Sequence, residues 1–193
     1  MAVKAVVFDL GETLLDETAL WESAADAAGV PRFTLMGVLG GLAARGEPHS
    51  SAWEILGVEP PATSWRGDGF YADALPSLRR LRAREFVVGA AGNTPVEAED
   101  LLREHVDFVG SSSRWCVEKP AMAFFERVAA EAGLPFADIA YVGDRVDNDV
   151  EPALAAGMVA VDIRRGPWGH LHEPPSAAVR IDSVDELPQV LGV

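Results

Sequence analysis

Acidic side chains and one lysine follow the apolar runs of this chain, where their types could support phosphoryl-group chemistry. Asp9 ends the first apolar run, Asp144 ends a later one, and Lys119 lies between them in the sequence. Carboxylate oxygens are hard ligands suited to Mg²⁺, and a carboxylate can also act as a nucleophile. A lysine beside them can balance their charge and orient a phosphoryl oxygen. Because phosphoryl transfer depends mainly on positioning and charge neutralisation, these residue types indicate such a site.

Each of these residues also has an ordinary structural explanation. Asp9 could be a turn or cap residue, Asp149 could cap the helix that follows it, and Lys119 could be an exposed residue before a proline. No single residue is specific. Their order along the chain, each near the end of an expected strand, is what favours a functional site.

The elements that must position these residues form an alternating pattern. Short apolar runs predict buried strands at residues 3–8, 86–91, 107–110, 139–142 and 159–163. Segments with helical spacing lie between them, at residues 73–84, 95–104, 120–132 and 149–156. This alternation predicts an α/β fold, a Rossmann-like parallel sheet with helices on both faces. Ligands bind such sheets at the carboxyl ends of the strands, so we expect the acids and the lysine to gather at one edge.

The segment at residues 16–70 does not fit this alternation. It contains helical patches at residues 17–28, 33–44 and 49–56, separated by breaks rich in glycine and proline, and no convincing strand. We therefore expect a small all-helical cap at 16–70 beside a core formed by 1–15 and 71–193. Its tryptophans are expected to pack within the helical layer, with a pocket wall as the alternative. Its candidate substrate contacts are its tryptophans (Trp21, Trp53 and Trp65), Arg32, Arg45, His49 and Arg66.

Composition narrows the possible partners. The formal net charge of -14 repels nucleic-acid phosphates and anionic lipid, so we expect neither nucleic acid nor membrane as a partner. An anionic substrate would need local positive charge from a metal or a basic side chain. The longest uncharged stretch, residues 33–44, is well short of the roughly 20 residues that span a membrane. Cys116 is the single cysteine, so no intrachain disulfide is possible, and we expect a cytoplasmic monomer or homodimer.

Two polar segments near the C-terminus are expected to lie at the surface. His170-Leu171-His172 could chelate a metal, but the surrounding glycines and prolines favour a polar surface loop. Arg164-Arg165 could bind an anion, although a solvated turn is the favoured interpretation.

Together the motifs resemble those of the haloacid dehalogenase-like hydrolase superfamily over nearly the whole chain. In that family one strand ends in Asp-x-Asp-x-Thr/Val and a second ends in Ser or Thr. A Lys follows, and a last strand ends in Gly-Asp with further acids downstream. The corresponding segments here are Phe8-Asp9-Leu10-Gly11-Glu12-Thr13, Ala91-Gly92-Asn93-Thr94, Glu118-Lys119-Pro120 and Val142-Gly143-Asp144 through Asn148-Asp149. The insert at 16–70 is similar to the helical cap that one large subgroup carries after its first strand.

The resemblance implies roles for the matching residues. Asp9 would form an aspartyl-phosphate, and Lys119 would hold the nucleophile and the phosphoryl group together. A Mg²⁺ cofactor would lie between Asp9, Asp144 and the main-chain carbonyl of Gly11. The phosphoryl group of a small phosphorylated substrate would be bound in the turns after the first two strands, at Thr13, Gly92 and Asn93. Asp149, or less favourably Asp147, would orient Lys119 or a metal-bound water.

Two positions depart from the family pattern. Gly11 stands where the family's phosphatases usually have a second Asp, which protonates the leaving oxygen and later activates water. General acid–base help of this kind is typically worth roughly 10²–10⁴-fold. Gly92 replaces the Ser or Thr, which removes one hydroxyl donor. Glu12 could substitute for the missing acid, although we expect its side chain to point the other way.

Three functions are compatible with this pattern. The favoured one is a Mg²⁺-dependent phosphatase of small phosphorylated metabolites, slowed by the loss at Gly11. The second is a non-catalytic protein that binds a phosphorylated ligand or a protein partner, suggested by the paired losses at Gly11 and Gly92. The third and least favoured is a 2-haloacid dehalogenase, which would also lack the second Asp. Enzymes of that kind work without the metal that Asp144 would bind.

Overall fold

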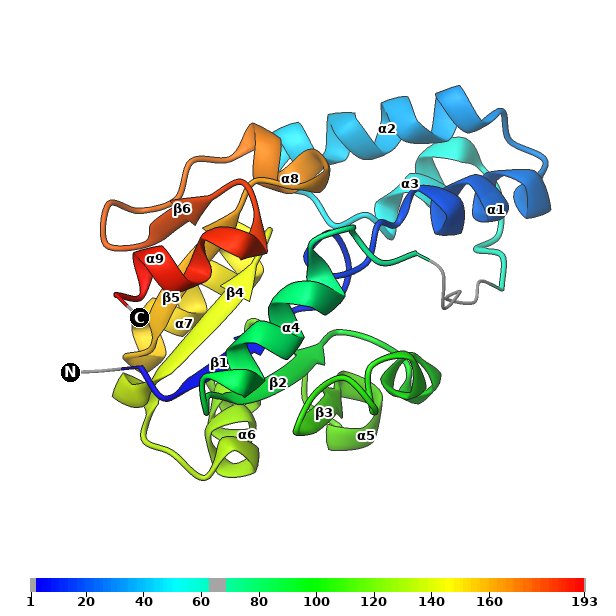
Figure 1. Cartoon of the computed structure of the whole chain (residues 1–193). Helices are drawn as coiled ribbons and strands as arrows, with labels where there is room; N and C mark the ends of the chain where they lie inside the picture. Colours follow the sequence, from blue (N-terminus) through cyan, green and yellow to red (C-terminus); the bar gives the residue numbers. More distant parts are fainter. Residues whose placement is uncertain (1–2, 63–68, 193) are drawn as a thin grey trace.

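The computed structural model describes residues 3–62 and 69–192, and its centre is a six-stranded parallel sheet. The strand order is β3-β2-β1-β4-β5-β6 (Figure 1). The strands are β1 (Ala5–Phe8), β2 (Val87–Gly92), β3 (Phe108–Ser111), β4 (Ile139–Gly143), β5 (Val159–Ile163) and β6 (Val179–Ile181). The predicted α/β class and parallel sheet are confirmed. The prediction missed β6, because this short strand buries only Ile181 and has no apolar run.

The central position of β1 decides where Asp9 is found. Phe8 pairs with Ala90 of β2 on one side and with Val142 of β4 on the other. The backbone N–H of Asp9 then donates to the carbonyl of Val142, at 2.8 Å. Asp9 therefore emerges between the C-terminal ends of two neighbouring strands.

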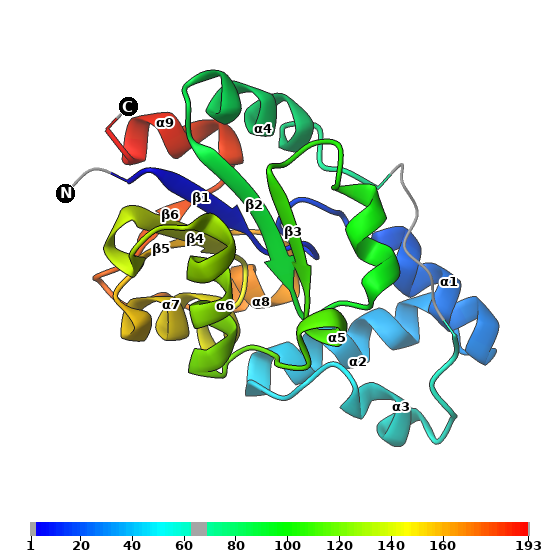
Figure 2. The ribbon, with the colours of Figure 1, turned by 90° about the horizontal axis from the view of Figure 1, so that it is seen from below.

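Helices cover both faces of the sheet, as predicted. Val6 and Phe8 of β1 face one hydrophobic cluster, whereas Ala5 and Val7 face the other, as the alternation of a strand requires. The first face is covered by α4 (Ala74–Ala83), η1 (Val96–Leu101), η4 (Val184–Glu186) and α9 (Leu187–Val190). The second face is covered by α5 (Ser112–Trp115), α6 (Met122–Ala132) and α7 (Glu151–Ala156). Figure 2 shows α4 and α9 on one side of the sheet and α6 and α7 on the other.

Two predicted helices differ in form. The segment expected at 95–104 is the 3₁₀ helix η1, whose buried Glu99 accepts hydrogen bonds from Ser111 and Arg114. The helix expected from residue 149 instead opens with a π-helical turn, η3 (Val146–Val150), before α7. A further 3₁₀ turn, η2 (Phe136–Asp138), leads into β4. Each of these two segments contains a buried carboxylate, Glu99 or Asp149, that binds neighbouring groups. The backbone around it is a 3₁₀ helix or a π-helical turn instead of a regular α-helix.

Three helices between β1 and α4 form a separate layer beyond the strand ends (Figure 1). They are α1 (Thr18–Ala28), α2 (Arg32–Arg45) and α3 (Ser51–Leu56). The helical unit α1–α3 has its own apolar cluster, in which Leu35, Leu39 and Trp53 are buried. The first two helices end at Gly29 and Gly46, whose φ angles of 69° and 67° favour glycine. Trp65 and Arg66 lie outside the described residues.

His170 and Leu171 are exposed at the surface, as predicted, but the predicted loop conformation at 170–172 was wrong. Residues Gly166–Leu171 form a short helix, α8, with Pro167 in its first turn and Trp168 buried. His172 follows α8, and its Nε2 lies 2.6 Å from the carbonyl oxygen of Ala43 in α2. The sequence suggested a loop because glycine and proline dominate locally, but a buried tryptophan fixes the segment against the helical unit.

We expected Arg164 and Arg165 to lie in a solvated turn, and this expectation is wrong for Arg165. Arg164 is half-exposed and pairs with Asp182. Arg165 is buried instead, donating to the carbonyl of Thr13 and pairing with Asp73 at the start of α4. Its guanidinium also lies over the ring of Tyr71, 4.1 Å from the centroid. Partners for both terminal nitrogens and for the face of the guanidinium explain why this arginine is not a surface residue.

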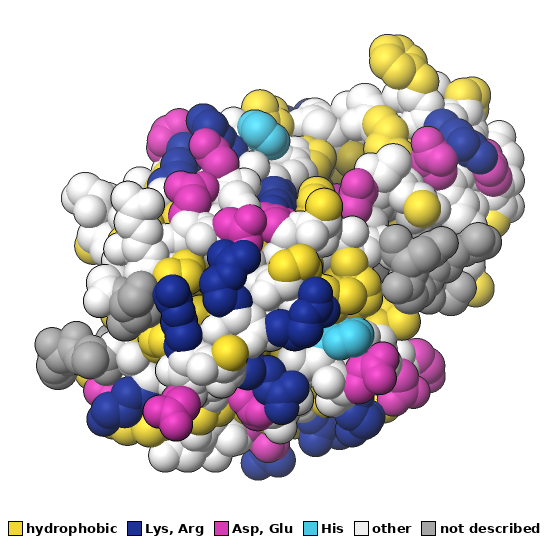
Figure 3. Space-filling model, viewed as in Figure 1, with side chains coloured by type: hydrophobic (Ala, Val, Ile, Leu, Met, Phe, Trp, Pro, Cys, Tyr) yellow, Lys and Arg dark blue, Asp and Glu magenta, His cyan; other side chains and the backbone are white. Residues whose placement is uncertain are grey.

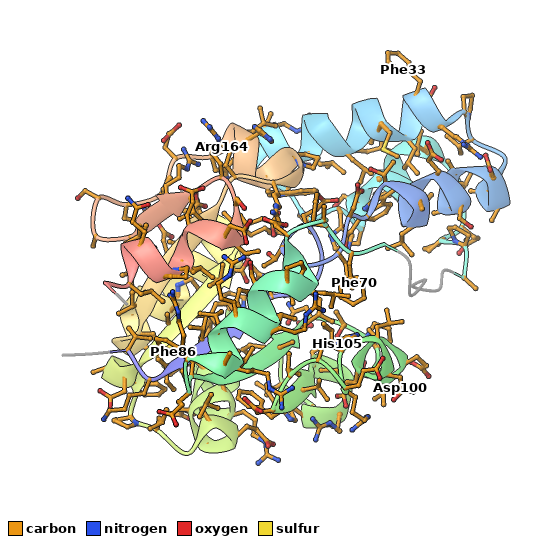
Figure 4. The ribbon with its side chains drawn as sticks, in the orientation of Figure 1. Phe33, Phe70, Phe86, Asp100, His105 and Arg164 are labelled. Atoms are coloured by element: carbon orange, nitrogen blue, oxygen red, sulfur yellow. The ribbon has the colours of Figure 1, made fainter. Side chains whose placement is uncertain are left out.

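The surface carries paired charges and few large apolar side chains. Figure 3 shows Lys and Arg side chains gathered over α4, where Arg80 pairs with Asp185 and Arg82 with Asp107. Phe33 projects from α2 and is 91% exposed (Figure 4). No single helix in the described ranges is long and apolar enough to cross a membrane. Only α1 and α2 taken together have the length and composition for it, and the pair is bent by 118°.

Candidate active site

A cavity of about 370 Å³ lies between the C-terminal ends of the central strands and the helical unit α1–α3. Both parts of the molecule line it. The sheet side contributes Asp9, Gly11, Asn93, Thr94, Lys119 and Asp144, together with Arg145 and Trp168. The helical side contributes Glu17, Trp21 and His49. The predicted gathering of acids and lysine at one edge of the sheet is therefore present.

Lys119 is the charged centre of this cavity. Its Nζ lies 2.7 Å from Asp9 Oδ1 and 2.5 Å from Asp149 Oδ1, and the side chain is almost fully buried. Burial alone would lower the pKa of Lys119, but the charges of Asp149 and Asp9 outweigh it and raise that pKa. The ammonium is therefore held charged at the point where a phosphoryl group bound to Asp9 would need a cation.

Asn93 holds the backbone of Lys119 rather than pointing freely into the cavity. Its Nδ2 donates to the carbonyl oxygen of Lys119 at 3.0 Å, and its Oδ1 accepts from the backbone N–H of Lys119 at 2.8 Å. This paired contact fixes a loop from a distant part of the chain against the end of β2. Sequence reasoning placed Asn93 near the phosphate but did not find this contact.

Two glycines at strand ends allow carboxylates to lie directly against the sheet. A Cβ on Gly92 would lie 2.3 Å from Asp9 Oδ1, and a Cβ on Gly143 would lie 2.3 Å from Asp149 Oδ2. Real Cβ atoms essentially never make such short contacts. The glycine that replaces a hydroxyl residue at the end of β2 thus gives Asp9 the space it occupies in this structure.

Three carboxylates converge closely enough to hold a metal ion. Oxygens of Asp9, Asp144 and Asp149 all lie within 4.8 Å of one another. Asp144 is buried, and no ion pair reaches it among the described residues. Burial, then the negative charges of Asp149 and Asp9, raises the pKa of Asp144 strongly. A set of hard oxygen ligands with uncompensated negative charge fits Mg²⁺.

Asp149 is tied to its neighbours more firmly than Asp144. Besides Lys119, it accepts a hydrogen bond from the backbone N–H of Arg145, at 3.0 Å. Burial raises the pKa of Asp149 to about 6, although the charge of Lys119 opposes the shift. These contacts hold Asp149 against Lys119, and its orienting role stays a prediction. Asp147, the less favoured alternative, pairs with Arg145, is half-exposed and does not line the cavity.

Thr13 lies apart from the cavity. It is completely buried, its Oγ1 has no hydrogen-bond partner within residues 3–62 and 69–192, and its carbonyl accepts from Arg165. Arg32 and Arg45 of the helical unit also lie elsewhere, in exposed ion pairs with acids of that unit. Neither arginine lines the cavity.

The aromatic wall of the cavity joins the two parts of the molecule. The His49 ring lies between Trp21, at 5.4 Å, and Trp168, at 6.3 Å between centroids. Burial, followed by the charge of Arg145, lowers the pKa of His49, which keeps its ring neutral at neutral pH. Trp21 lines the cavity, which was the alternative expectation for the tryptophans of residues 16–70. Trp53 packs inside the helical unit, which was the favoured expectation. Trp168 and Arg145 were missed, because no local motif marks them.

Glu12 is turned toward the segment that re-enters the core. Its Oε2 accepts from the Tyr71 hydroxyl at 2.5 Å, and its Oε1 accepts from the backbone N–H of Glu17 at 3.0 Å. Its φ of 49° lies in the left-handed region, which is uncommon for a residue with a side chain. Both carboxylate oxygens are therefore occupied by structural hydrogen bonds.

Comparison with known proteins shows the family of this chain. The sequence model of a family described as haloacid dehalogenase-like hydrolase matches residues 3–157, which is more than half of the chain. A glyceraldehyde 3-phosphate phosphatase of Methanopyrus kandleri is 38% identical over 64% of this chain and 55% of that protein. A protein of the same name from Methanocaldococcus jannaschii is 30% identical over 63% of this chain and 56% of its own length. The chain thus spans about half the length of the curated relatives it matches.

Solved structures share the fold across nearly the whole chain. A crystal structure described as a HAD phosphatase from Thermococcus onnurineus aligns with a TM-score of 0.68 and 21% identity, covering 98% of both chains. At this identity the likeness concerns the fold alone.

Proposed function

Because this chain belongs to the haloacid dehalogenase-like hydrolase family, we propose that it hydrolyses phosphate monoesters of small metabolites with the help of Mg²⁺. The observation that carries this proposal is the buried Lys119 ammonium, paired with both Asp9 and Asp149 beside the buried carboxylate of Asp144. The two relatives named as glyceraldehyde 3-phosphate phosphatases support a small phosphorylated substrate.

In this proposal the helical unit α1–α3 is the cap of the family's subgroup with an insert after the first strand. The core is residues 1–15 and 71–193, and the cap is residues 16–70. The separate apolar cluster of α1–α3 supports this division. Trp21 and His49 from the cap, facing Asp9 and Lys119 from the core, limit the cavity to a small substrate.

Each residue of the site has its own role in the proposed hydrolysis. The carboxylate of Asp9 attacks the phosphorus atom, and the ester oxygen leaves on the opposite side. Lys119 holds Asp9 and a phosphoryl oxygen together, while Asp149 and Asn93 fix Lys119. Water then hydrolyses the aspartyl-phosphate and restores Asp9. Asp9, Asp144 and the carbonyl of Gly11 would hold Mg²⁺, which neutralises charge on the phosphoryl oxygens when bound.

Phosphate release from a substrate panel tests the proposal. The panel contains glyceraldehyde 3-phosphate, other sugar phosphates, nucleotides and an aryl phosphate, each with Mg²⁺ and with chelator. We expect Mg²⁺-dependent release that is lost in Asp9→Asn. Binding without turnover on the whole panel would instead support a ligand-binding protein. Chelator-insensitive halide release from a 2-haloacid would support a dehalogenase.

A further inference from the structure

Position 11 leaves the site without the carboxyl group that would move a proton to the leaving oxygen. Hydrolysis of an alkyl phosphate still needs such a group, because an alkoxide is a poor leaving group unless it is protonated. Among the described residues, three glutamates outside the metal-ligand set line the cavity: Glu12, Glu17 and Glu118. Glu118 is exposed, next to Lys119. Glu12 is unsuited, because Tyr71 and the backbone of Glu17 occupy both of its oxygens.

Glu17 is placed differently, at the residue before α1 where the chain leaves the core. Its Oε2 accepts a hydrogen bond from Trp21 Nε1 at 2.8 Å, so the side chain is held against the aromatic wall. Within the described part of the chain, no hydrogen bond is made to its Oε1. The side chain is half-buried and lines the same cavity as Asp9 and Lys119. One oxygen anchored and one free is the arrangement that a proton-transferring carboxyl group requires.

We propose that Glu17, from the helical unit, is the general acid and base that replaces the carboxylate missing at Gly11. This inference rests on the proposed phosphatase function. It assigns to the cap a catalytic group that in other phosphatases of the family belongs to the core motif. Catalysis then depends on α1 keeping Glu17 and Trp21 in the wall of the cavity.

The electrostatic surroundings agree with this role. Burial, followed by the charge of Glu12, raises the pKa of Glu17 to about 8, while the hydrogen bond from Trp21 opposes the shift. A carboxyl group with such a pKa carries its proton at neutral pH and can also accept one back. That is the property a group needs to act as acid in one step and as base in the next.

The two steps balance as follows. In the first, an oxygen of Asp9 forms a bond to phosphorus as the bond from phosphorus to the ester oxygen breaks, and the leaving oxygen takes the proton of Glu17. In the second, water attacks phosphorus and gives a proton to the Glu17 carboxylate as the bond from phosphorus to Asp9 breaks. The products are an alcohol and inorganic phosphate, and both Asp9 and Glu17 return to their starting states.

The test compares Glu17→Gln with the wild type on an alkyl phosphate and on an aryl phosphate whose phenolate leaves without a proton. Gln keeps the shape and can still accept from Trp21, but it carries no transferable proton. We expect turnover of the alkyl phosphate to fall by roughly 10²–10⁴-fold. With the aryl phosphate we expect a rapid burst of phenolate, about one per enzyme, followed by slow turnover, because water activation is impaired.

Controls separate this inference from the proposed function and from simple structural damage. Glu22→Gln removes an exposed charge from the same helix, outside the cavity, and should behave as wild type. Glu17→Ala should regain alkyl-phosphate turnover when imidazole is added, because its protonated form is a small diffusible acid near neutral pH. Wild-type turnover with an unchanged Glu17→Gln on both substrates would overturn the inference alone. Absence of turnover in the wild type on every substrate would overturn the proposed function and this inference with it.

Discussion

At the scale of residues, both the side-chain ammonium and the backbone of Lys119 are held by neighbouring residues of the site. Its ammonium contacts Asp9 and Asp149, while Asn93 bonds both its backbone N–H and its carbonyl. Orientation by neighbouring groups of this kind commonly changes activity by 10–100-fold when it is lost.

Asp149→Asn should therefore lower kcat/KM by roughly 10–100-fold, because Lys119 loses the charge that holds it beside Asp9. Asp147→Asn is the matched control, since that acid is half-exposed and pairs only with Arg145. The measurement is steady-state kinetics of both variants over a range of Mg²⁺ concentrations. Equal effects of the two substitutions would contradict the role assigned to Asp149.

Sequence reasoning could place the gathering of Asp9, Asp144 and Lys119 at one edge of the sheet, because Asp9 and Asp144 follow strands and Lys119 precedes the helix that leads into β4. It missed contacts between distant segments. The bond of Asn93 to Lys119 and the position of Glu17 depend on how separate segments pack. No local spacing encodes such contacts, so a single sequence could not reveal them.

At the scale of elements, the ends of the strands are shaped by glycine. A Cβ on Gly143 would meet three atoms of Asp149 within 2.5 Å, and this carboxylate is completely buried. By contrast, a Cβ on Gly40 in α2 meets no atom within 4 Å. Replacing glycine by alanine should therefore cause a steric clash at position 143 and none at position 40.

Gly143→Ala should lower the free energy of unfolding by about 1–3 kcal/mol through overpacking, and lower activity by displacing Asp149. Gly40→Ala should raise the free energy of unfolding by about 0.5–1 kcal/mol, because alanine favours the helix. Denaturant unfolding of both variants measures the difference. A Gly143→Ala protein as stable and active as the wild type would show that the strand end has room to relax.

Asp73, just before α4, joins elements that are far apart in the sequence. It accepts from Ser183 and from the backbone N–H of Val184, and it pairs with the buried Arg165. Burial alone would raise the pKa of Asp73, but the hydrogen bond from Ser183 and the charge of Arg165 outweigh it and lower the pKa below 3.8. A lowered pKa means that folding favours the charged carboxylate.

Asp73→Asn should therefore lower the free energy of unfolding by about 2 kcal/mol at neutral pH. The difference from wild type should persist above pH 3.8 and shrink as the pH falls through the lowered pKa of the folded protein, where the wild-type carboxylate is also protonated. Asp182→Asn, which breaks the exposed pair with Arg164, should cost less than about 1 kcal/mol. A pH-independent difference for Asp73→Asn would argue against the charged network.

The elements themselves were predictable where the pattern was long and apolar. Five strands and the main helices follow from apolar runs and helical spacing. β6 and α8 were missed, since β6 buries little and α8 begins with Gly166 and Pro167. What holds α8 is the burial of Trp168 and the contact from His172 to Ala43, which are tertiary effects.

At the scale of the whole molecule, the helical unit α1–α3 meets the sheet part at the cavity and next to α8, and the segment that re-enters the core makes contacts of its own. His172 reaches the carbonyl of Ala43 in α2, and Phe70 packs edge-on against His105 at 5.8 Å, where Figure 4 shows the two rings side by side. Leu15 and Phe70 also pair as an isolated bridge where the chain leaves and re-enters the core. Asp9 and Asp144 of the acidic cluster line the cavity between the two parts, so their charge state bears on the stability of the whole.

Mg²⁺ should therefore raise the melting temperature of the wild type, because binding to the folded protein alone stabilises it by about 2.7 kcal/mol at 100 times the Kd. Asp144→Asn should remove this response and, without metal, melt no earlier than the wild type. The reason is that the substitution relieves repulsion among three close carboxylates. Melting curves with Mg²⁺ and with chelator provide the measurement. A Mg²⁺ response unchanged in Asp144→Asn would place the metal elsewhere.

The central claim is that Asp9 forms a covalent bond to phosphorus, and trapping that intermediate tests it most directly. The enzyme is mixed with Mg²⁺ and a substrate labelled in its phosphoryl group, quenched in acid within one turnover, and mapped by peptide mass spectrometry. Glu17→Gln should accumulate more of the intermediate than the wild type. We expect one phosphoryl group on the peptide that contains Asp9, and none in Asp9→Asn. Phosphate release by the wild type with no label on that peptide, or with label on another residue, would contradict it.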